Sequence, residues 1–370
     1  MKIDDLTLTL FAWDDIPATI YGGHTGEFKG RSDLGLLTLR TDEGVEGNAF
    51  LGSASRTAEH DAGSLIRYLK PMVMGRNPLD RESLWQGLWQ GYRSTTLRAI
   101  GAVDVALWDI AGKVAGLPVH QLLGSYRTNV PAYASSPVHQ TAEAYVEEAC
   151  DLKSRGWSAY KIHPPTRWEL DIDVCKAVRE AVGDSYRVML DSTWSYRYEE
   201  ALRVGLAIEE LGFYWYEDPL ADDDILNYVK LRQKLNIPIM ATEYAPGGHP
   251  ASYASWIVHQ ATDFLRGDVA VKGGLTPCLK TAHMAEGFRM NYEVHHGGNS
   301  HNNFANMHLI MAIKNCEYFE VLLPDASQKY GVINEIAVDS DGLVHAPMAP
   351  GIGAEIDFDL IDAKKTNVLS

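Results

Sequence analysis

Three carboxylates in the middle of the chain constrain its fold more than any other feature. Asp191, Glu217 and Glu243 each follow a short apolar run, and successive acids are 26 residues apart. Such runs are typical of buried strands in a parallel sheet, and an amphipathic helical stretch lies between successive acids, for example residues 199–211. A strand, a helix and their loops take about 30 residues, so each acid ends the strand of one repeating unit. The pattern predicts an α/β fold, a (β/α)₈ barrel of the TIM type, whose C-terminal strand ends converge on one face.

At that face the three carboxylates would lie close together, and their mutual repulsion would be severe without a cation. Carboxylate oxygens are the ligands that Mg²⁺ prefers, so the cluster predicts an octahedral Mg²⁺ site made by Asp191, Glu217 and Glu243. A single acid after a strand is more often a helix cap or a solvated loop residue. A cap or loop role does not explain why three acids occupy the same point of three successive strand–helix units.

The chain is long enough for a second domain, because its 370 residues exceed the about 250 that a barrel needs. Near the N-terminus, alternating apolar residues and a tight turn indicate an antiparallel meander, followed by a helical region with a stop signal at Gly116 and Pro118. After residue 325 the sequence becomes irregular and proline-rich. We predict an N-terminal α+β capping domain at residues 1–125, the barrel at residues 126–325, and a C-terminal segment at residues 326–370 that returns to the cap.

Composition and charge limit the partners of the protein. The composition, 46% hydrophobic and 22% charged, is that of an ordinary soluble globular protein. A formal charge of −16 argues against nucleic acid or an anionic membrane as a partner. Four cysteines without paired spacing indicate free thiols, and neither a zinc site nor a disulfide framework. The acidic start and the lack of a long apolar run predict a cytoplasmic protein, which we expect to be a homo-oligomer.

Polar side chains also mark the other predicted barrel strands. Lys161 and His163 belong to a second strand at residues 159–163 and point to the same side, because they are two residues apart. The remaining candidates are Asp268 in a sixth strand at residues 264–271 and Glu320 in an eighth strand at residues 317–321.

The predicted seventh strand, residues 290–296, offers two histidines. Successive side chains of a strand alternate between its two faces. His295 shares a face with Asn291 and Glu293, whereas His296 shares a face with mainly apolar side chains. The apolar face should pack on the helices. His295 is therefore predicted to face the barrel centre, and His296 is the second choice.

In combination these motifs resemble those of the enolase superfamily, and of its mandelate racemase type. The resemblance covers nearly the whole chain and rests on the helix at residues 102–113, the three acids, and Gly273-Gly274 after the sixth strand. Dehydratases of this type act on sugar acids. The resemblance implies Mg²⁺ on the three acids and removal of the proton beside a substrate carboxylate, which the metal assists by spreading the charge that develops.

The same resemblance implies a role for each remaining candidate. Lys161 matches a cation beside the substrate carboxylate, and His163 stands where the family more commonly has a second lysine. Histidine can act as a base near neutral pH, so His163 is a candidate base. Asp268 and His295 match a His–Asp dyad, in which the carboxylate orients the imidazole. Glu320 matches an acidic hydrogen-bond donor on the last strand.

Dehydration of a sugar acid, an aldonate or an aldarate, to a 2-keto-3-deoxy acid is the predicted reaction. A racemase or epimerase with bases on opposite faces of the substrate is the alternative, because the second and the seventh strand both carry a basic group. A non-catalytic protein that binds sugar acids is a third reading, against which the retained polar groups argue. A muconate-type cycloisomerase fits less well, since that branch carries lysine at the position of Asp268. Loops around His24 and near Phe50 resemble the family's capping loops, which would select the substrate.

Overall fold

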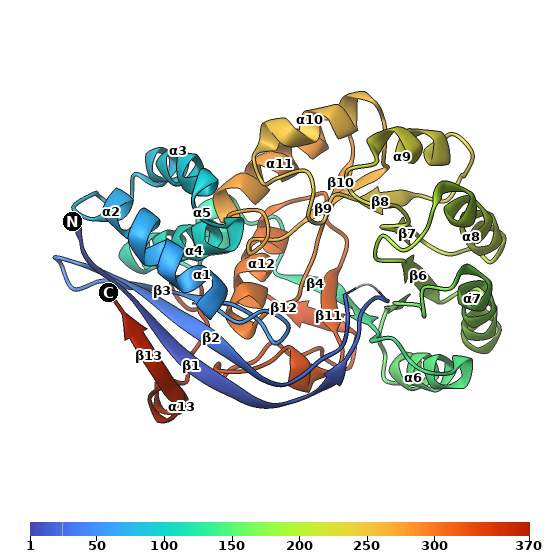
Figure 1. Ribbon diagram of the computed structural model, residues 1–370, viewed down its shortest axis with the longest axis horizontal. Helices are drawn as coiled ribbons and strands as arrows, with labels where there is room; N and C mark the ends of the chain where they lie inside the picture. Colours follow the sequence, from blue (N-terminus) through green and yellow to red (C-terminus); the bar gives the residue numbers. More distant parts are fainter. Residues whose placement is uncertain (24) are drawn as a thin grey trace.

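A four-stranded antiparallel sheet is the centre of the capping domain, within residues 1–23 and 25–370, which the structure describes. In this computed structural model the sheet order is β13–β1–β2–β3 (Figure 1). The strands span Ile3–Thr19 (β1), Phe28–Thr41 (β2), Glu46–Leu51 (β3) and Lys365–Leu369 (β13). Alternate residues of β1, such as Leu6 and Leu8, are fully buried, as a half-buried strand requires. Because β13 pairs with β1, the C-terminal tail completes the capping domain, as predicted.

Helix α4 (Leu97–Ala115) packs against β2 and β3 and lies between the sheet and the barrel (Figure 1). Thr96 fixes its start by accepting a hydrogen bond from the Ala99 amide at 3.2 Å, and Gly116 ends it with a left-handed backbone, φ 67°. The other helical segments of this domain are α1 (Glu59–Ser64), a π-helical turn (Leu65–Leu69), α2 (Lys70–Val73), α3 (Arg81–Gln90), a 3₁₀ turn (Gly91–Arg93) and α5 (Val119–Leu123). Among the described residues, none of the helices combines the length and the apolar character that crossing a membrane requires.

Parallel strands form the barrel, in the order β10–β9–β8–β7–β6–β5–β4–β11. They span Asn129–Ser135 (β4), Ala159–Ile162 (β5), Arg187–Asp191 (β6), Tyr216–Glu217 (β7), Ile239–Ala241 (β8), Phe264–Gly267 (β9), Asn291–Val294 (β10) and Phe319–Leu322 (β11). Helices alternate with the strands and cover the outside (Figure 1): Ala142–Ser154 (α6), Trp168–Val182 (α7), Tyr198–Glu210 (α8), Ile225–Arg232 (α9), Pro250–Val258 (α10), Leu275–Gly287 (α11) and Ser300–Ala312 (α12). The predicted barrel with its capping domain is confirmed.

In the described chain no barrel helix follows β11. The chain makes a 3₁₀ turn at Asp325–Ser327 instead, where Ser327 Oγ lies 2.8 Å from the hydroxyl of Thr19 on β1. It continues to β12 (Leu343–His345), which pairs antiparallel with β4, and to α13 (Phe358–Lys364) before β13. The backbone that would form an eighth helix is thus used to contact the capping domain and the first barrel strand.

The sixth strand is shorter than predicted. β9 ends at Gly267, and Asp268 Oδ1 accepts a hydrogen bond from the Val271 amide at 2.8 Å, which closes a turn. Aspartate side chains commonly bind the backbone of the next few residues in this way and so compete with regular structure. Asp268 therefore belongs to the loop at the C-terminal face of the barrel.

Helix α4 joins the two domains through the first turn of α11. The carboxylate of Asp104 accepts hydrogen bonds from the Thr276 amide at 2.9 Å and from the Thr276 hydroxyl at 2.6 Å. A side chain of the capping domain thereby caps a helix of the barrel. Gly274 permits this approach, because a Cβ atom there would lie 2.2 Å from Asp104 Oδ2. Burial raises the pKa of Asp104 to about 6.

Replacing Asp104 by asparagine should make the stability of the protein less dependent on pH. The pKa of Asp104 is higher in the folded protein than its ordinary 3.8, so folding favours the protonated form. The free energy of unfolding of the wild type should fall, relative to that of Asp104→Asn, as the pH rises from 3.8 through about 6. Urea unfolding over this range measures the difference, and parallel curves would contradict the prediction. Asp104→Ala, which removes the cap, should be less stable than Asp104→Asn by about 1–3 kcal/mol.

Candidate active site

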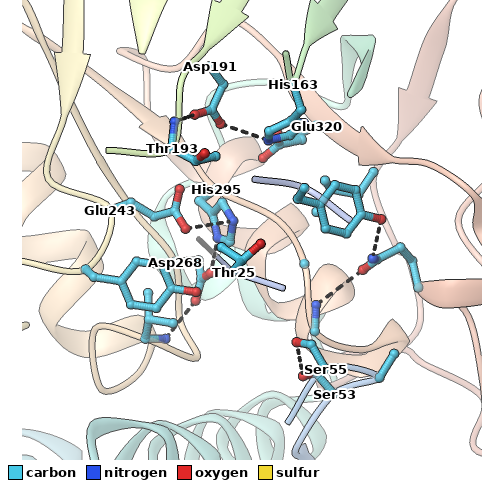
Figure 2. Close-up of a pocket in the computed structure, with 18 of the residues that line it drawn as sticks. Thr25, Ser53, Ser55, His163, Asp191, Thr193, Glu243, Asp268, His295 and Glu320 are labelled. Atoms are coloured by element: carbon cyan, nitrogen blue, oxygen red, sulfur yellow. Dashed lines mark hydrogen bonds and ion pairs between the residues drawn. The ribbon is translucent and has the colours of Figure 1, made fainter. Parts of the chain in front are cut away.

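A cavity of about 400 Å³ lies at the C-terminal ends of the barrel strands, against the capping domain (Figure 2). A volume of this size suits a small metabolite. The barrel side chains that line it include Lys161, His163, Asp191, Asp218, Glu243, Asp268, His295 and Glu320. From the capping domain come Tyr21, Thr25, Phe28, Arg98 and residues 53–55. Of the predicted site residues, only Glu217 does not reach the cavity surface; it is fully buried and contacts Lys161.

The three carboxylates at the strand ends lie together. One oxygen atom from each of Asp191, Glu217 and Glu243 lies within 4.8 Å of the others. Asp191 is the last residue of β6 and Glu217 the last residue of β7, and the two residues pair across these strands. Parallel pairing therefore holds their side chains next to each other.

Glu243 comes two residues after β8, and the backbone at Thr242 directs it toward the other acids. Thr242 has a φ of 85°, which is unusual for a β-branched residue. Its hydroxyl donates to the Arg266 carbonyl at 3.1 Å and accepts from the Arg266 amide at 2.9 Å. These two bonds to β9 hold the strained residue in place.

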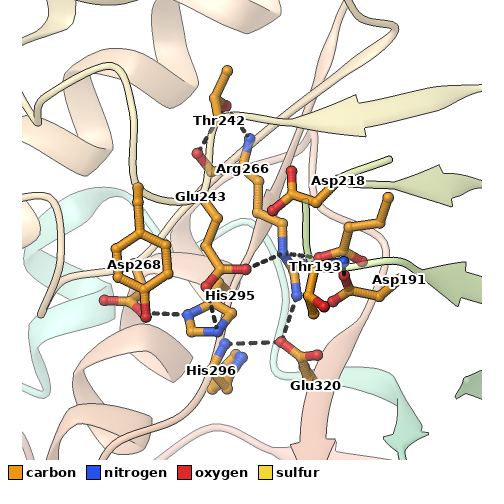
Figure 3. Close-up of polar contacts among 12 residues, drawn as sticks. Asp191, Thr193, Asp218, Thr242, Glu243, Arg266, Asp268, His295, His296 and Glu320 are labelled. Atoms are coloured by element: carbon orange, nitrogen blue, oxygen red, sulfur yellow. Dashed lines mark hydrogen bonds and ion pairs between the residues drawn. The ribbon is translucent and has the colours of Figure 1, made fainter. Parts of the chain in front are cut away.

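Two buried cations, Lys161 and Arg266, lie among the carboxylates. Lys161 Nζ is 3.0 Å from Asp191 Oδ2, 3.0 Å from Glu217 Oε2 and 2.7 Å from Glu320 Oε1. Arg266 on β9 is fully buried, and its Nη2 lies 2.6 Å from Glu320 Oε2 (Figure 3). Its Nε lies 2.5 Å from Glu217 Oε1. These contacts compensate part of the clustered negative charge.

The pKa values of Glu217, Asp191 and Lys161 are shifted by burial and by the neighbouring charges. Burial and the repulsion of Asp191 raise the pKa of Glu217 to about 8, although the attraction of Arg266 opposes this shift. Burial acts in the same direction on Asp191, but attraction by Lys161 and His163 is stronger and lowers the pKa of that carboxyl. Burial would lower the pKa of Lys161, but the surrounding carboxylates raise it well above its ordinary value. Lys161 is therefore a cation at neutral pH. The raised pKa of Glu217 indicates that an additional positive charge beside this carboxyl group would stabilise its ionised form.

The surroundings of Asp218 fit a bound metal ion. Its Oδ1 atom is buried without a hydrogen-bond partner among the described residues, while Oδ2 accepts a bond from Trp194 Nε1 at 3.1 Å. Burial and the repulsion of Asp222 and Glu243 raise the pKa of Asp218 well above its ordinary value. A buried, unpartnered carboxylate oxygen beside three clustered carboxylates is stabilised by a cation. Oxygen donors of this kind suit Mg²⁺.

His163 lies one residue after β5 and lines the cavity (Figure 2). Its Nδ1 lies 2.7 Å from the carbonyl oxygen of Ser136. A carbonyl can only accept, so Nδ1 carries the proton. Nε2 then lies 3.0 Å from Asp191 Oδ2 and is the nitrogen available for proton transfer. The ring of Tyr21 packs beside the imidazole, with 5.3 Å between the centroids, and helps to fix it.

His295 and Asp268 are in direct contact (Figure 3). Asp268 Oδ2 accepts a hydrogen bond from His295 Nδ1, and His295 Nε2 lies 3.2 Å from Glu243 Oε1. Burial would lower the pKa of His295, but Glu243 and Asp268 outweigh it and raise that pKa. Asp268 thus closes the turn after β9 with one oxygen and holds an imidazole with the other.

His296 does not line this cavity in the described structure. Its ring packs on Phe319, with 4.0 Å between the centroids, and its Nδ1 lies 3.2 Å from the Val294 carbonyl oxygen. Burial lowers the pKa of His296 to about 3, so it is neutral. The side chain that the structure brings to Asp268 is that of His295, the first choice from the sequence.

Glu320 lies between the two buried cations, Lys161 and Arg266. Its Oε2 also accepts a hydrogen bond from the His296 amide at 2.9 Å. Burial would raise the pKa of Glu320, but Arg266 and Lys161 lower it well below its ordinary value. This charge environment favours a carboxylate that accepts hydrogen bonds, whereas the family resemblance implies a donor. The donor role stays a prediction.

Arg266 and Arg98 were not predicted from the sequence. Arg266 lies inside an apolar strand, and its only signal is a charge at a position that should be buried. Arg98 reaches the cavity through the docking of the capping domain, which periodicity cannot predict. Phe50, expected near the substrate, packs in the core against Phe11 at 5.6 Å between centroids, and residues 53–55 line the cavity instead. His24 lies outside the described residues.

Two family profiles match most of the chain. Residues 27–124 match the N-terminal domain of mandelate racemase and muconate lactonizing enzyme. Residues 144–360 match a profile described as enolase C-terminal domain-like.

Individual relatives agree with these profiles. The crystal structure of D-glucarate dehydratase from Agrobacterium tumefaciens, complexed with magnesium, is 34% identical in sequence, with a TM-score of 0.88 over 99% of this chain and 100% of that chain. Arabinonate dehydratase from Saccharolobus solfataricus is 28% identical over 308 residues, 79% of this chain and 80% of the relative. L-talarate/galactarate dehydratase from Salmonella typhimurium is 29% identical over 272 residues, 70% of this chain and 67% of the relative.

Proposed function

The chain belongs to the enolase superfamily, in the group of mandelate racemase and muconate lactonizing enzymes, and we propose that it removes the proton alpha to the carboxylate of a sugar acid. The proposed outcome is dehydration of an aldonate or aldarate to a 2-keto-3-deoxy acid. The observation that carries the proposal is a cluster of three carboxylates, two of which line the same cavity as two histidines. The similarity to sugar-acid dehydratases supports the substrate class.

Asp191, Glu217 and Glu243 would hold Mg²⁺ in this proposal. The bound ion would stabilise the negative charge that develops on the substrate carboxylate as the alpha proton leaves. Lys161, held as a cation among these acids, would lie beside the same carboxylate and add a fixed positive charge.

The histidines would move the protons. Neutral His295 accepts the proton from C2 through Nε2, and Asp268 stabilises the imidazolium through Nδ1. The electron pair left at C2 forms a double bond to C3 while the C3 hydroxyl leaves with a proton, as water. The protonated form of His163, whose Nε2 faces the cavity, would give that proton. The enol that results becomes the 2-keto-3-deoxy acid when C3 takes a proton and the hydroxyl on C2 loses one.

A racemase or epimerase is the second candidate, and the second histidine is the observation that favours it. β5 and β10, which precede His163 and His295, are separated by β6, β7, β8 and β9 in the strand order of the barrel. Two bases on different sides of a bound substrate could remove the alpha proton from one face and return a proton to the other.

A screen of aldonic and aldaric acids with Mg²⁺ tests the proposed function. Dehydration gives a 2-keto-3-deoxy acid, which reacts with semicarbazide to give an ultraviolet signal, whereas epimerisation gives a change in optical rotation without a keto product. If every acid of the panel bound in the presence of Mg²⁺ without either signal or loss of the alpha proton, the protein would be a non-catalytic binder.

His163→Ala should separate the one-base and the two-base reactions. If His163 is a working base, its loss should stop exchange of the alpha proton with deuterated water from one face and leave exchange through His295 intact. Deuterium incorporation followed by NMR measures this, with His163→Lys, which restores the commoner family residue, as the matched control that should keep part of the activity. If His163→Ala exchanges and turns over like the wild type, His163 only lines the pocket and a one-base dehydration is favoured.

A further inference from the structure

Arg98 is a half-buried cation in the wall of the cavity, contributed by the capping domain. It is the second residue of α4, whose first turn is already capped by Thr96. The guanidinium lies beside Tyr244, with 6.0 Å between its central carbon and the ring centroid. Tyr244 follows Glu243 directly, so Arg98 is placed near the clustered carboxylates but belongs to the other domain.

Arg98 differs in charge pairing from Lys161, the other lysine or arginine that lines the cavity. Lys161 contacts the carboxylates of Asp191, Glu217 and Glu320 at 3.0 Å or less. No carboxylate oxygen of the described residues lies within 4.0 Å of Arg98. A guanidinium that is partly removed from water gains most from an anion that offers two oxygens.

Several other side chains that line the cavity are polar and uncharged, although Phe28 and Ala54 of the capping domain are apolar. Ser53 Oγ and Ser55 Oγ lie 3.1 Å apart (Figure 2). Thr25 and Gln328 also line the cavity. Such hydroxyl and amide groups suit the hydroxyls of a sugar chain. The cavity therefore offers clustered carboxylates with Lys161 for one acidic end of a substrate, polar groups for its middle, and Arg98 for a further anionic group.

We propose that Arg98 binds a second carboxylate of the substrate, so that the protein acts on dicarboxylic sugar acids in preference to monocarboxylic ones. This inference rests on the proposed function, because it assumes that the first carboxylate is bound at Asp191, Glu217 and Glu243. An aldonate would place a neutral hydroxymethyl group beside Arg98 and would leave the cation without a carboxylate in direct contact. Loss of one hydrogen bond to a charged group weakens binding by roughly 10- to 100-fold.

Matched pairs of acids that differ only at the far end test the inference: galactarate with galactonate, and glucarate with gluconate. For the pair with the reactive stereochemistry, the wild type should have a kcat/KM for the dicarboxylate roughly 10- to 100-fold above that for the monocarboxylate. Arg98→Gln should remove this preference, mainly by raising KM for the dicarboxylate, and should leave the monocarboxylate nearly unchanged. Arg98→Lys should keep part of the preference, since it keeps the charge. Arg93→Gln, which changes an exposed arginine of the nearby 3₁₀ turn, should behave like the wild type.

Equilibrium binding separates this inference from the proposed function. Calorimetry with the same pairs in a His295→Asn background, with and without Arg98→Gln, measures affinity without turnover. Stronger binding of the dicarboxylate that depends on Arg98, without any keto product from the active protein, would sustain the inference and overturn the proposed dehydration. If Arg98→Gln weakened the binding of both acids equally, the inference would be overturned, because Arg98 would then act through Tyr244 or through the dyad of His295 and Asp268. A preference for the monocarboxylate, or no binding of either acid, would also overturn it.

Discussion

Glu217→Gln is expected to lower turnover on the order of 10³-fold or more, because the proposed Mg²⁺ would supply several kcal/mol of stabilisation to the transition state. Glu217 is the central acid of the cluster, between Asp191 on β6 and Glu243 after β8. Its carboxylate also compensates two buried cations, Lys161 and Arg266. Glutamine keeps the shape of the side chain but removes the charge, so both metal binding and the placement of Lys161 should weaken.

Calorimetric titration with Mg²⁺ provides the direct measurement, and undiminished Mg²⁺ binding by Glu217→Gln would disprove the assignment of the metal site. Circular dichroism must show that the variant is folded, since the loss of a buried charge partner destabilises a protein. Asp191→Asn is a second test of the same site, because the side chain of Asp191 contacts Lys161 but not Arg266. Glu210→Gln, at an exposed position at the end of α8, is the matched control and should bind Mg²⁺ like the wild type.

The strand-end acids were predictable because one repeating unit sets their positions. Each unit contributes one buried strand, so an acid at the same point of successive units arrives at the same edge of the sheet. For this reason the 26-residue spacing predicted that Asp191, Glu217 and Glu243 lie together, which the structure shows. The alternation of side chains along a strand likewise predicted that His295, and not His296, faces Asp268.

The charges that surround these acids were not predictable from the same pattern. Arg266 is buried in the middle of β9, where its partners are Glu217 two strands away and Glu320 on β11. A pattern of apolar residues predicts that this position is buried but does not name the partner of a charge there. The contact exists because the sheet closes into a barrel and brings distant strands to a common interior.

The contributions of the capping domain were missed for a second reason. Asp104 and Arg98 lie on the same helix, α4, and the helical period alone places neither against the barrel. Their surroundings depend on how the first turn of α11 docks on α4, where Gly274 allows Asp104 to approach. Contacts between domains are set by tertiary packing, not by local periodicity.

His295→Asn and Asp268→Asn should each lower turnover by roughly 10³- to 10⁴-fold, because each removes one member of the proposed pair of base and orienting carboxylate. His295 Nδ1 donates to Asp268 Oδ2, and the other ring nitrogen is left to face Glu243 and the cavity. Without the carboxylate, the imidazole loses both the bond that fixes its protonated nitrogen and the charge that stabilises the imidazolium. Asp268→Asn also keeps an oxygen that can accept from the Val271 amide, so the turn after β9 should survive.

The double variant decides whether the two residues act as one unit. If both residues serve the same proton transfer, the double variant should lose little more turnover than the more damaging single variant. The fold reduction should be far smaller than the product of the two single fold reductions. Loss of alpha-proton exchange with deuterated water should follow the loss of turnover in all three variants. His296→Asn is the matched control: its ring packs on Phe319 outside the cavity, so it should affect stability more than turnover. If His296→Asn abolished turnover while His295→Asn did not, the base would lie on the other face of β10. If the two single losses multiplied in the double variant, His295 and Asp268 would act in separate steps.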